Sequence, residues 1–279
     1  MTRARSQLLL LLAPVTVFYA VFLLLPYAMV LRLSLFRYSA MQLYTSELTI
    51  ANYVQVVSNP FYLALMARTI GLGVLVSVIC LLLGFPLALK IARSGPATKS
   101  LLLAVTLSPL LINLVVRTYA WLVLLGDTGV VNTWLKALGW IASPLPLSGT
   151  MLSVVIGLVH ISLPLMVLSL VGVLERMDAG LIDAAESLGA SRARVLRRIV
   201  LPVCMPGIGA GSLLVFSFTI SAFITPALLG GNRVSTVSTL IYEKFTFSSN
   251  WPVGATLVMA LLVINIAVIA LHGRLFREG

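Results

Sequence analysis

The sequence predicts an all-α integral membrane protein with about six transmembrane helices. Of its 279 residues, 60% are hydrophobic and only 10% are charged, whereas a soluble domain carries about 25% charged residues. Six stretches are apolar over the roughly 20 residues that a helix needs to cross a bilayer. They lack the alternation of a transmembrane β-barrel, and a helix satisfies its own backbone hydrogen bonds in lipid.

The predicted spans follow one another with short connections. We place them at residues 8–31, 66–92, 101–125, 151–174, 203–229 and 253–272. The first follows two arginines, as the apolar run of a signal peptide does, but it is longer than the roughly 7–15 residues typical of such a run. We therefore expect a retained helix. No connection is long enough for a soluble domain, so we expect residues 1–279 to form a single transmembrane domain.

Basic residues are distributed unevenly between the two sides of the predicted bundle. With the N-terminus inside, the inner side holds twelve of the 19 lysines and arginines, namely Arg3, Arg5, Lys90, Arg93, Lys99, Arg176, Arg192, Arg194, Arg197, Arg198, Arg274 and Arg277. This bias predicts that both termini and the loop 175–202 are cytoplasmic. The net charge of +11 is then a consequence of topology and does not indicate nucleic-acid binding.

The sequence lacks motifs for covalent or metal chemistry. It has no HExxH, no GxSxG and no phosphate-binding loop, and its Cys and His residues are not clustered at metal-ligand spacing. Cys80 and Cys204 fall within or beside spans and are interpreted as buried thiols. We therefore expect no catalytic residue, no metal and no cofactor in this chain, so that any ATP is bound and hydrolysed by another chain.

Polar side chains inside the predicted spans are candidates for function because they are costly in lipid. Arg117 lies in the third span, where it could snorkel outward, pair with a carbonyl, or belong to a transport pathway. His160 in the fourth span is more simply an interhelical hydrogen-bonding residue than a ligand. None of the predicted spans contains Asp or Glu, which argues against proton- or sodium-coupled transport.

A dense polar segment interrupts two apolar runs at residues 178–206, DAGLIDAAESLGASRARVLRRIVLPVCMP. Asp178 can cap a first helix, whose apolar stripe is Leu181, Ile182, Ala185 and Leu188. Gly189 can end that helix, and Ser191 can cap a second one. The second helix has Val195, Leu196 and Ile199 opposite Arg194, Arg197 and Arg198. Two interpretations are open: arginines that bind anionic lipid headgroups, or a docking element for a soluble partner.

The string DAAESLGASRARVLRRIVLPVCMPGI resembles the EAA loop of permease subunits of binding-protein-dependent type I ABC importers. Asp183 stands where that family usually has Glu, and the matching residues are Ala184, Ala185, Gly189, Leu201 and Pro202. The resemblance implies the type I permease fold and coupling helices that sit in a cleft of a separate ATPase subunit. Asp183 keeps the carboxylate on a side chain one methylene shorter.

Strings along nearly the whole chain are similar to the spermidine/putrescine-type permeases. They include LLLPYAMVLRLSLF, LGFPLALKIAR, RTYAWLVLLGDTGVVN and FITPALLGG. The string RTYAW draws attention to Arg117, Tyr119 and Trp121, which with His160 are candidate pathway or packing residues. The sequence departs from the pattern at Ala222 and Ala227, where polyamine permeases commonly carry carboxylates. A cargo other than a polyamine therefore stays open.

The resemblance implies a permease subunit in a bacterial inner membrane that imports a small polar solute. Its implied partners are a second, related permease, two ATPase subunits and a periplasmic binding protein, besides the lipid bilayer. The rival interpretations are a secondary transporter or channel without an ATPase, an intramembrane enzyme, and an orphan or exporter-like permease of the same family. The absence of intramembrane carboxylates, of an evident inverted repeat and of a catalytic set disfavours the first two.

Overall fold

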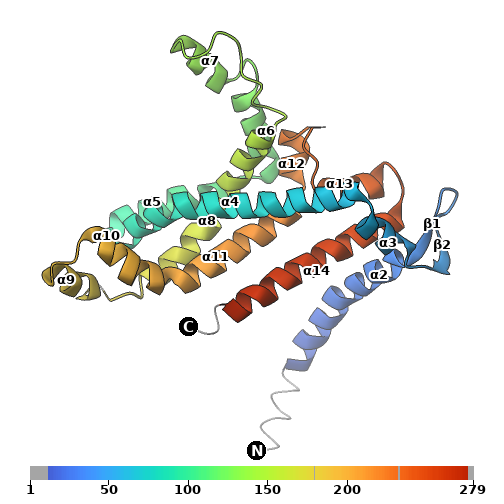
Figure 1. Cartoon of the computed structure of the whole chain (residues 1–279), viewed down its shortest axis with the longest axis horizontal. Coiled ribbons are helices and arrows are strands. Elements are labelled where there is room, and N and C mark those ends of the chain that lie inside the picture. The colour runs from blue at the N-terminus through green and yellow to red at the C-terminus, as the bar shows by residue number, and fades with distance from the viewer. Residues whose placement is uncertain (1–11, 179, 232, 276–279) are drawn as a thin grey trace, which may run out of the picture. The chain divides into compact units, whose positions relative to one another are not determined.

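The computed structural model describes residues 12–178, 180–231 and 233–275, and these are mostly helical (Figure 1). Six helical segments in this part of the chain are long and apolar enough to cross a membrane, and one of them, Leu114–Ala137, joins two helices across a short turn. The six segments are Leu12–Ser34, Pro60–Ala92, Leu114–Ala137, Met151–Leu174, Arg192–Ser221 and Trp251–Arg274. The predicted all-α membrane fold is confirmed. Arg3, Arg5 and Arg277, which contribute to the predicted topology, lie outside the described residues.

The chain divides into two compact units. The first contains the described residues up to Leu63 together with Leu240–Val263, and the second contains Ala64–Thr239 with the residues from Ile264 onward. The elements that lie wholly in the first unit are η1 (Ala20–Leu24), α2 (Leu25–Ser34), β1 (Phe36–Ser39), β2 (Leu43–Leu48) and α3 (Ala51–Ser58). Helices α4 (Pro60–Ala92), α13 (Val237–Thr246) and α14 (Trp251–Leu275) each contribute residues to both units.

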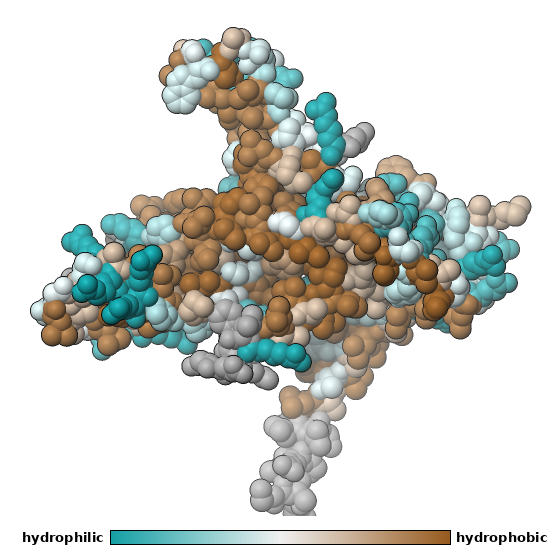
Figure 2. Space-filling model, viewed as in Figure 1, coloured by the Kyte–Doolittle hydropathy of each residue, from teal (hydrophilic) through white to brown (hydrophobic). Residues whose placement is uncertain are grey.

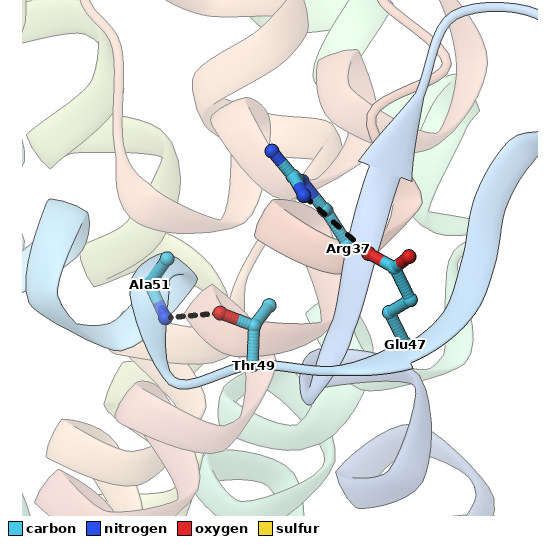
Figure 3. A network of polar contacts seen from close by, with 4 residues as sticks. All are labelled: Arg37, Glu47, Thr49 and Ala51. Atoms are coloured by element: carbon cyan, nitrogen blue, oxygen red, sulfur yellow. Dashed lines mark hydrogen bonds and ion pairs between the residues drawn. The ribbon is translucent and has the colours of Figure 1, made fainter.

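Polar contacts hold the turn between α2 and α3 in the first unit. The buried amide of Asn52 donates to the carbonyls of Ser34, at 2.9 Å, and Phe36, at 2.8 Å. These two carbonyls lie where the chain leaves α2 and enters the antiparallel hairpin β1–β2. The hairpin carries an ion pair between Arg37 and Glu47 at 3.4 Å, and the Thr49 hydroxyl accepts from the Ala51 amide before α3 (Figure 3).

The second unit is built around two long helices that lie side by side (Figure 1). Besides its parts of α4, α13 and α14, the second unit contains α5 (Pro96–Leu111), α6 (Leu114–Leu125), α7 (Val130–Ala137), α8 (Met151–Leu174), α9 (Gly180–Ser187), α10 (Arg192–Val195), η2 (Leu196–Val200), α11 (Leu201–Ser221) and α12 (Ile224–Leu229). The two long helices are α8 and α11. Helices α8 and α11 approach closely because α11 carries glycines. A Cβ on Gly207 would lie 2.9 Å from the Ser169 carbonyl of α8, the close backbone approach that small residues permit.

The predicted span 101–125 is divided into two helices. Helix α5 ends at Leu111, Ile112 is extended, and α6 begins at Leu114. The break arises because the side chain of Asn113 accepts from the backbone amides of Val115 and Val116, which starts a new helix in place of continuing the old one. The apolar pattern shows no sign of this break, because both helices are apolar.

The predicted span 203–229 is also interrupted. Helix α11 ends at Ser221, and Ala222 has an extended backbone before α12 begins at Ile224. Pro226 has no amide hydrogen to donate to the carbonyl of Ala222, and its ring would clash with that carbonyl in a continuous helix. In the observed arrangement Pro226 lies in the first turn of α12, where the amide would have no intrahelical partner.

Candidate functional site

Residues 175–202, which run from the end of α8 into the first turn of α11, are called the coupling segment. After α8 ends, the Asp178 carboxylate accepts a hydrogen bond of 2.8 Å from the Gly180 amide at the start of α9. The side chain of Asp178 thus accepts a hydrogen bond from the first turn of α9, as the sequence predicts. Residue 179 and the side chains of Asp183 and Glu186 lie outside the described part of the chain, so the carboxylate expected at Asp183 has no described contacts.

Gly189 ends α9 in the left-handed conformation that the sequence predicts. Its φ is +80°, and the Ala190 amide donates to the Ala185 carbonyl at 3.0 Å. This six-residue hydrogen bond across a left-handed glycine is the Schellman motif. A Cβ at Gly189 would meet no atom within 4 Å, so the requirement for glycine comes from the backbone conformation and not from crowding.

The apolar residues of α9 do not form one exposed stripe. Ile182 and Ala185 pack against the hydrophobic core of the second unit, whereas Leu181 is 49% exposed and Leu188 is 89% exposed. The expected single stripe is therefore divided into an inner part, which seats the helix on its own unit, and an outer part. The outer part leaves two leucines facing away from the core.

The second helix of the coupling segment continues without a break into the membrane helix. Residues Arg192–Ser221 form one helix of 30 residues, so the helix begins well before Pro202. A π-turn at η2 precedes the proline, and the Leu201 amide donates to the Leu196 carbonyl. Ser191 occupies the N-cap position, but its side chain makes no capping hydrogen bond.

An ion pair joins the coupling segment to the first turn of α5. Lys99 Nζ lies 2.7 Å from Glu175 Oε1, with about a third of each side chain exposed. Glu175 is the residue at which α8 ends. Sequence reasoning missed this contact because the two residues are far apart in the chain and neither belongs to a motif.

The candidate residue Arg117 lies at the break between α5 and α6. Its residue is 5% exposed, and its Nη1 donates to the carbonyl of Pro109. The last carbonyls of a helix have no intrahelical partners and carry partial negative charge, so the guanidinium closes the end of α5. Within the described residues, the Nη2 atom is buried without a hydrogen-bond partner. Of the alternatives raised by the sequence for Arg117, the structure shows the pairing of its guanidinium with a carbonyl.

The other three candidate membrane residues are placed differently. Trp121 lies one turn after Arg117 on α6, and its Nε1 donates to Nδ1 of His160 on α8 at 3.0 Å. The two rings meet edge to face with centroids 5.5 Å apart. Tyr119 does not join this contact and is 54% exposed. The structure thus brings together the tryptophan and the histidine and fastens α6 to α8.

An apolar groove in the second unit was not predicted. It has a volume of about 410 Å³ and is lined by α4, α11 and α14, with Ser77, Phe216 and His272 among its residues. Nearby, Ser217 of α11 donates to the Asn265 side chain of α14 at 2.7 Å. At the interruption after α11, Ala222 packs against the hydrophobic core and Ala227 lies on α12, so this stretch supplies no charge.

These features define a polytopic helical membrane protein with a structured polar segment between two membrane helices. Comparison with known proteins specifies the class further. The profile of the family described as "Binding-protein-dependent transport system inner membrane component" matches residues 81–278. The chain belongs to this family: it is a permease subunit of a type I ABC importer and a multi-pass protein of the inner membrane.

Individual relatives match most of the chain. The spermidine/putrescine transport system permease protein PotB of Haemophilus influenzae is 36% identical over 87% of this chain and 86% of its own length. PotB of Escherichia coli K12 is 33% identical over 77% of this chain and 80% of its own length. Among solved structures, a chain of a bacterial alginate ABC transporter superposes with a TM-score of 0.77, at 16% identity, covering 99% of this chain and 96% of that chain. The latter shows the shared fold.

Proposed function

We propose that this permease imports a polyamine such as spermidine or putrescine. The support is the name of several relatives, the spermidine/putrescine permeases that are 32–36% identical to this chain, together with the strings that the chain shares with that subfamily. Ala222 and Ala227 leave the stretch after α11 without the carboxylates expected for a dication, so the second permease would supply the negative charge. This cargo is tested by measuring the uptake of labelled spermidine by the whole importer in the presence of a neutral solute as competitor.

The topology in the proposal places both termini and the coupling segment in the cytoplasm. The support is the excess of lysine and arginine on that side. In the proposal, both compact units and all six spans act as one permease domain over residues 1–279. The partners are a second, related permease, an ATPase dimer and a periplasmic binding protein that delivers the cargo to the outer side. ATP binds to the ATPase, and this chain carries out no covalent chemistry.

The coupling segment transmits the movement of the ATPase in this proposal. The single observation that carries this step is the exposure of Leu181 and Leu188 on a short helix whose other apolar face is seated on the core. Two exposed leucines on a firmly seated helix suit a hydrophobic cleft on a soluble partner. Closure of the ATPases on ATP would move residues 178–200 as a rigid body, and the spans would alternate between inward- and outward-facing states.

The matched residues of the EAA loop have distinct roles in this proposal. The exposed Ala184 keeps the outer face of α9 slim enough to enter the cleft, Ala185 lets α9 pack closely on its own unit, and Gly189 sets the angle between α9 and α10. Leu201 and Pro202 lie where the coupling segment joins α11. Asp183 is proposed to contact the ATPase through its carboxylate. Arg117, Trp121 and His160 hold α6 in place, and the exposed Tyr119 is left as the candidate for the transport pathway.

A test of the docking step compares two leucine substitutions of equal size. The variant Leu188→Ser should lose most of the ATPase subunit during purification of the complex, because it removes an apolar side chain from the docked surface. Leu138→Ser changes a leucine that is 57% exposed outside the coupling segment, and it should retain the ATPase. Normal ATPase retention and normal uptake by Leu188→Ser would rule out docking through this helix.

A further inference from the structure

The coupling segment carries a second exposed surface, on the helix that follows Gly189. Arg194, Arg197 and Arg198 are all exposed. The opposite side of the same helix is seated on the core by Val195, which is 4% exposed, and Val200, which is 1% exposed. We call the three arginines the basic face. Figure 2 shows hydrophilic residues gathered at the end of the second unit where α9 and α10 lie.

The basic face has no acidic partner in the part of the chain that the structure describes. Of the two ion pairs found there, neither includes any of the three arginines. Three neighbouring guanidinium groups repel one another, and each presents several hydrogen-bond donors in a planar fork that suits phosphate oxygens. The chemistry that would satisfy this face is a layer of phosphate groups.

The length of the helix places the basic face at the depth of lipid phosphates. The helix Arg192–Ser221 has 30 residues, which corresponds to about 45 Å at 1.5 Å per residue. A bilayer measures about 30 Å across its hydrocarbon core and about 40–45 Å with its headgroups. Because the helix is longer than the core, part of it lies outside the hydrocarbon, and the charged first turns suit that position whereas residues 199–221 carry no charge. The three arginines are in those first turns, directly before the apolar run of α11.

The two helices of the coupling segment therefore present surfaces of different chemistry. Helix α9 exposes leucines, whereas the helix that begins at Arg192 exposes arginines and is continuous with a membrane span. We propose that the basic face binds the headgroups of anionic phospholipids and anchors the coupling segment at the membrane surface. This inference does not depend on the cargo or on docking of the ATPase.

The experiment uses the whole importer, reconstituted in nanodiscs of phosphatidylglycerol and phosphatidylcholine in equal amounts. Lipids that stay bound to the released complex are counted by native mass spectrometry. The variant R194Q/R197Q/R198Q should lose its preference for phosphatidylglycerol by about fivefold for each arginine replaced, since a basic residue near an anionic surface contributes about 1 kcal/mol. The variant R194K/R197K/R198K keeps the charge and should keep most of the preference.

A matched control removes three exposed charges elsewhere. The variant R37Q/K136Q/R233Q changes exposed basic residues outside the coupling segment, and its lipid preference should equal that of the wild type. An equal loss of preference in this control would overturn the proposal, because retention would then reflect total charge. Displacement of the bound lipid by soluble glycerol 3-phosphate would also overturn it, because the site would then be a free phosphate site.

The test separates the lipid from the ATPase as the partner of the basic face. If the arginine-to-glutamine variant keeps its lipid preference but loses the ATPase subunit, the face binds the ATPase and the proposal is wrong. Conversely, Leu188→Ser should lose the ATPase and keep its bound phosphatidylglycerol. Failure of the docking step and failure of the lipid anchor thus have different signatures.

Discussion

Lys99 Nζ lies 2.7 Å from Glu175 Oε1, and each of these two charges occupies the helix end that disfavours it. Lys99 is in the first turn of α5, near the partially positive N-terminus, and Glu175 caps the partially negative C-terminus of α8. The ion pair offsets both unfavourable placements. It also ties the first turn of α5 to the start of the coupling segment.

Exchanging these two charges provides the first prediction. Lys99→Glu or Glu175→Lys alone puts two like charges together and should lower the free energy of unfolding by about 1 kcal/mol or less, because the pair is partly exposed. The double variant K99E/E175K restores the pair and places each charge at the helix end that favours it. The free energy of unfolding of the double variant should equal that of the wild type or be higher by about 0.3–1 kcal/mol. Thermal unfolding of the purified chain at low and high salt measures this difference.

The salt series provides the control for this prediction. Screening by salt should reduce the differences in free energy of unfolding among the wild type, the two single variants and the double variant, since the Debye length falls to about 3 Å at 1 M salt. A double variant that is less stable than both single variants would contradict the dipole argument.

Arg117 closes the end of α5, and its removal is the second prediction. Arg117→Met leaves the buried carbonyl of Pro109 without its donor, so the stability should fall by about 1–3 kcal/mol. Arg117→Lys keeps one donor and should lose less. The matched control is Arg68→Met, because Arg68 is an exposed arginine of α4. The melting temperature in detergent reports the effect, and equal melting temperatures for the Arg117→Met and Arg68→Met variants would refute the capping role.

Gly189 gives the third prediction. A side chain at φ +80° costs about 1–2 kcal/mol in the left-handed region, so Gly189→Val should change the angle between α9 and α10. We expect ATP hydrolysis by the whole importer to continue while uptake falls. Gly189→Asn, which tolerates this conformation better, should retain more uptake.

The control for Gly189 is a glycine with ordinary backbone angles. Gly95 has φ −64° and also has open space at its Cβ position, so Gly95→Val should leave the ratio of uptake to ATP hydrolysis unchanged. Normal coupling in Gly189→Val would show that the turn geometry does not matter for transmission.

The contact between α8 and α11 gives the fourth prediction. Gly207→Ala places a Cβ 2.9 Å from both the Ser169 carbonyl and Val173 Cγ2, and such overpacking should destabilise the protein by about 1–3 kcal/mol. Gly172→Ala on α8 meets nothing within 4 Å and should be neutral or slightly stabilising. Unfolding of the two variants in detergent compares them directly, and equal stabilities would argue against close helix packing at Gly207.

Much of the coupling segment was predictable because its signals are local. The left-handed turn at Gly189 and the meeting of Asp178 with the first turn of α9 follow from the preferences of single residues, and both are present in the structure. The division of the apolar stripe was not predictable, because helical spacing places Ala185 and Leu188 on one face without telling which of them meets the core.

The breaks in the predicted spans show the same distinction between local signals in the sequence and contacts made in the folded protein. Asn113 and Pro226 lie in apolar runs, and hydropathy alone extends a span through each of them. At Asn113 the helix breaks because the Asn113 side chain accepts from the Val115 amide and starts a new helix. On the other side of the break, Arg117 donates to the Pro109 carbonyl at the end of α5. The Trp121–His160 contact needs two helices to meet, so no local signal in the sequence could have paired them.

The sequence by itself determined the membrane class, the approximate number of spans and the position of the polar coupling segment, because composition and periodicity reflect burial in lipid directly. The tertiary structure decided where the helices break, which apolar side chains of α9 face outward, and that Lys99 meets Glu175. These outcomes depend on contacts between residues that are distant in the chain. Such contacts form only when helices pack, and their energies are as large as the local preferences they override.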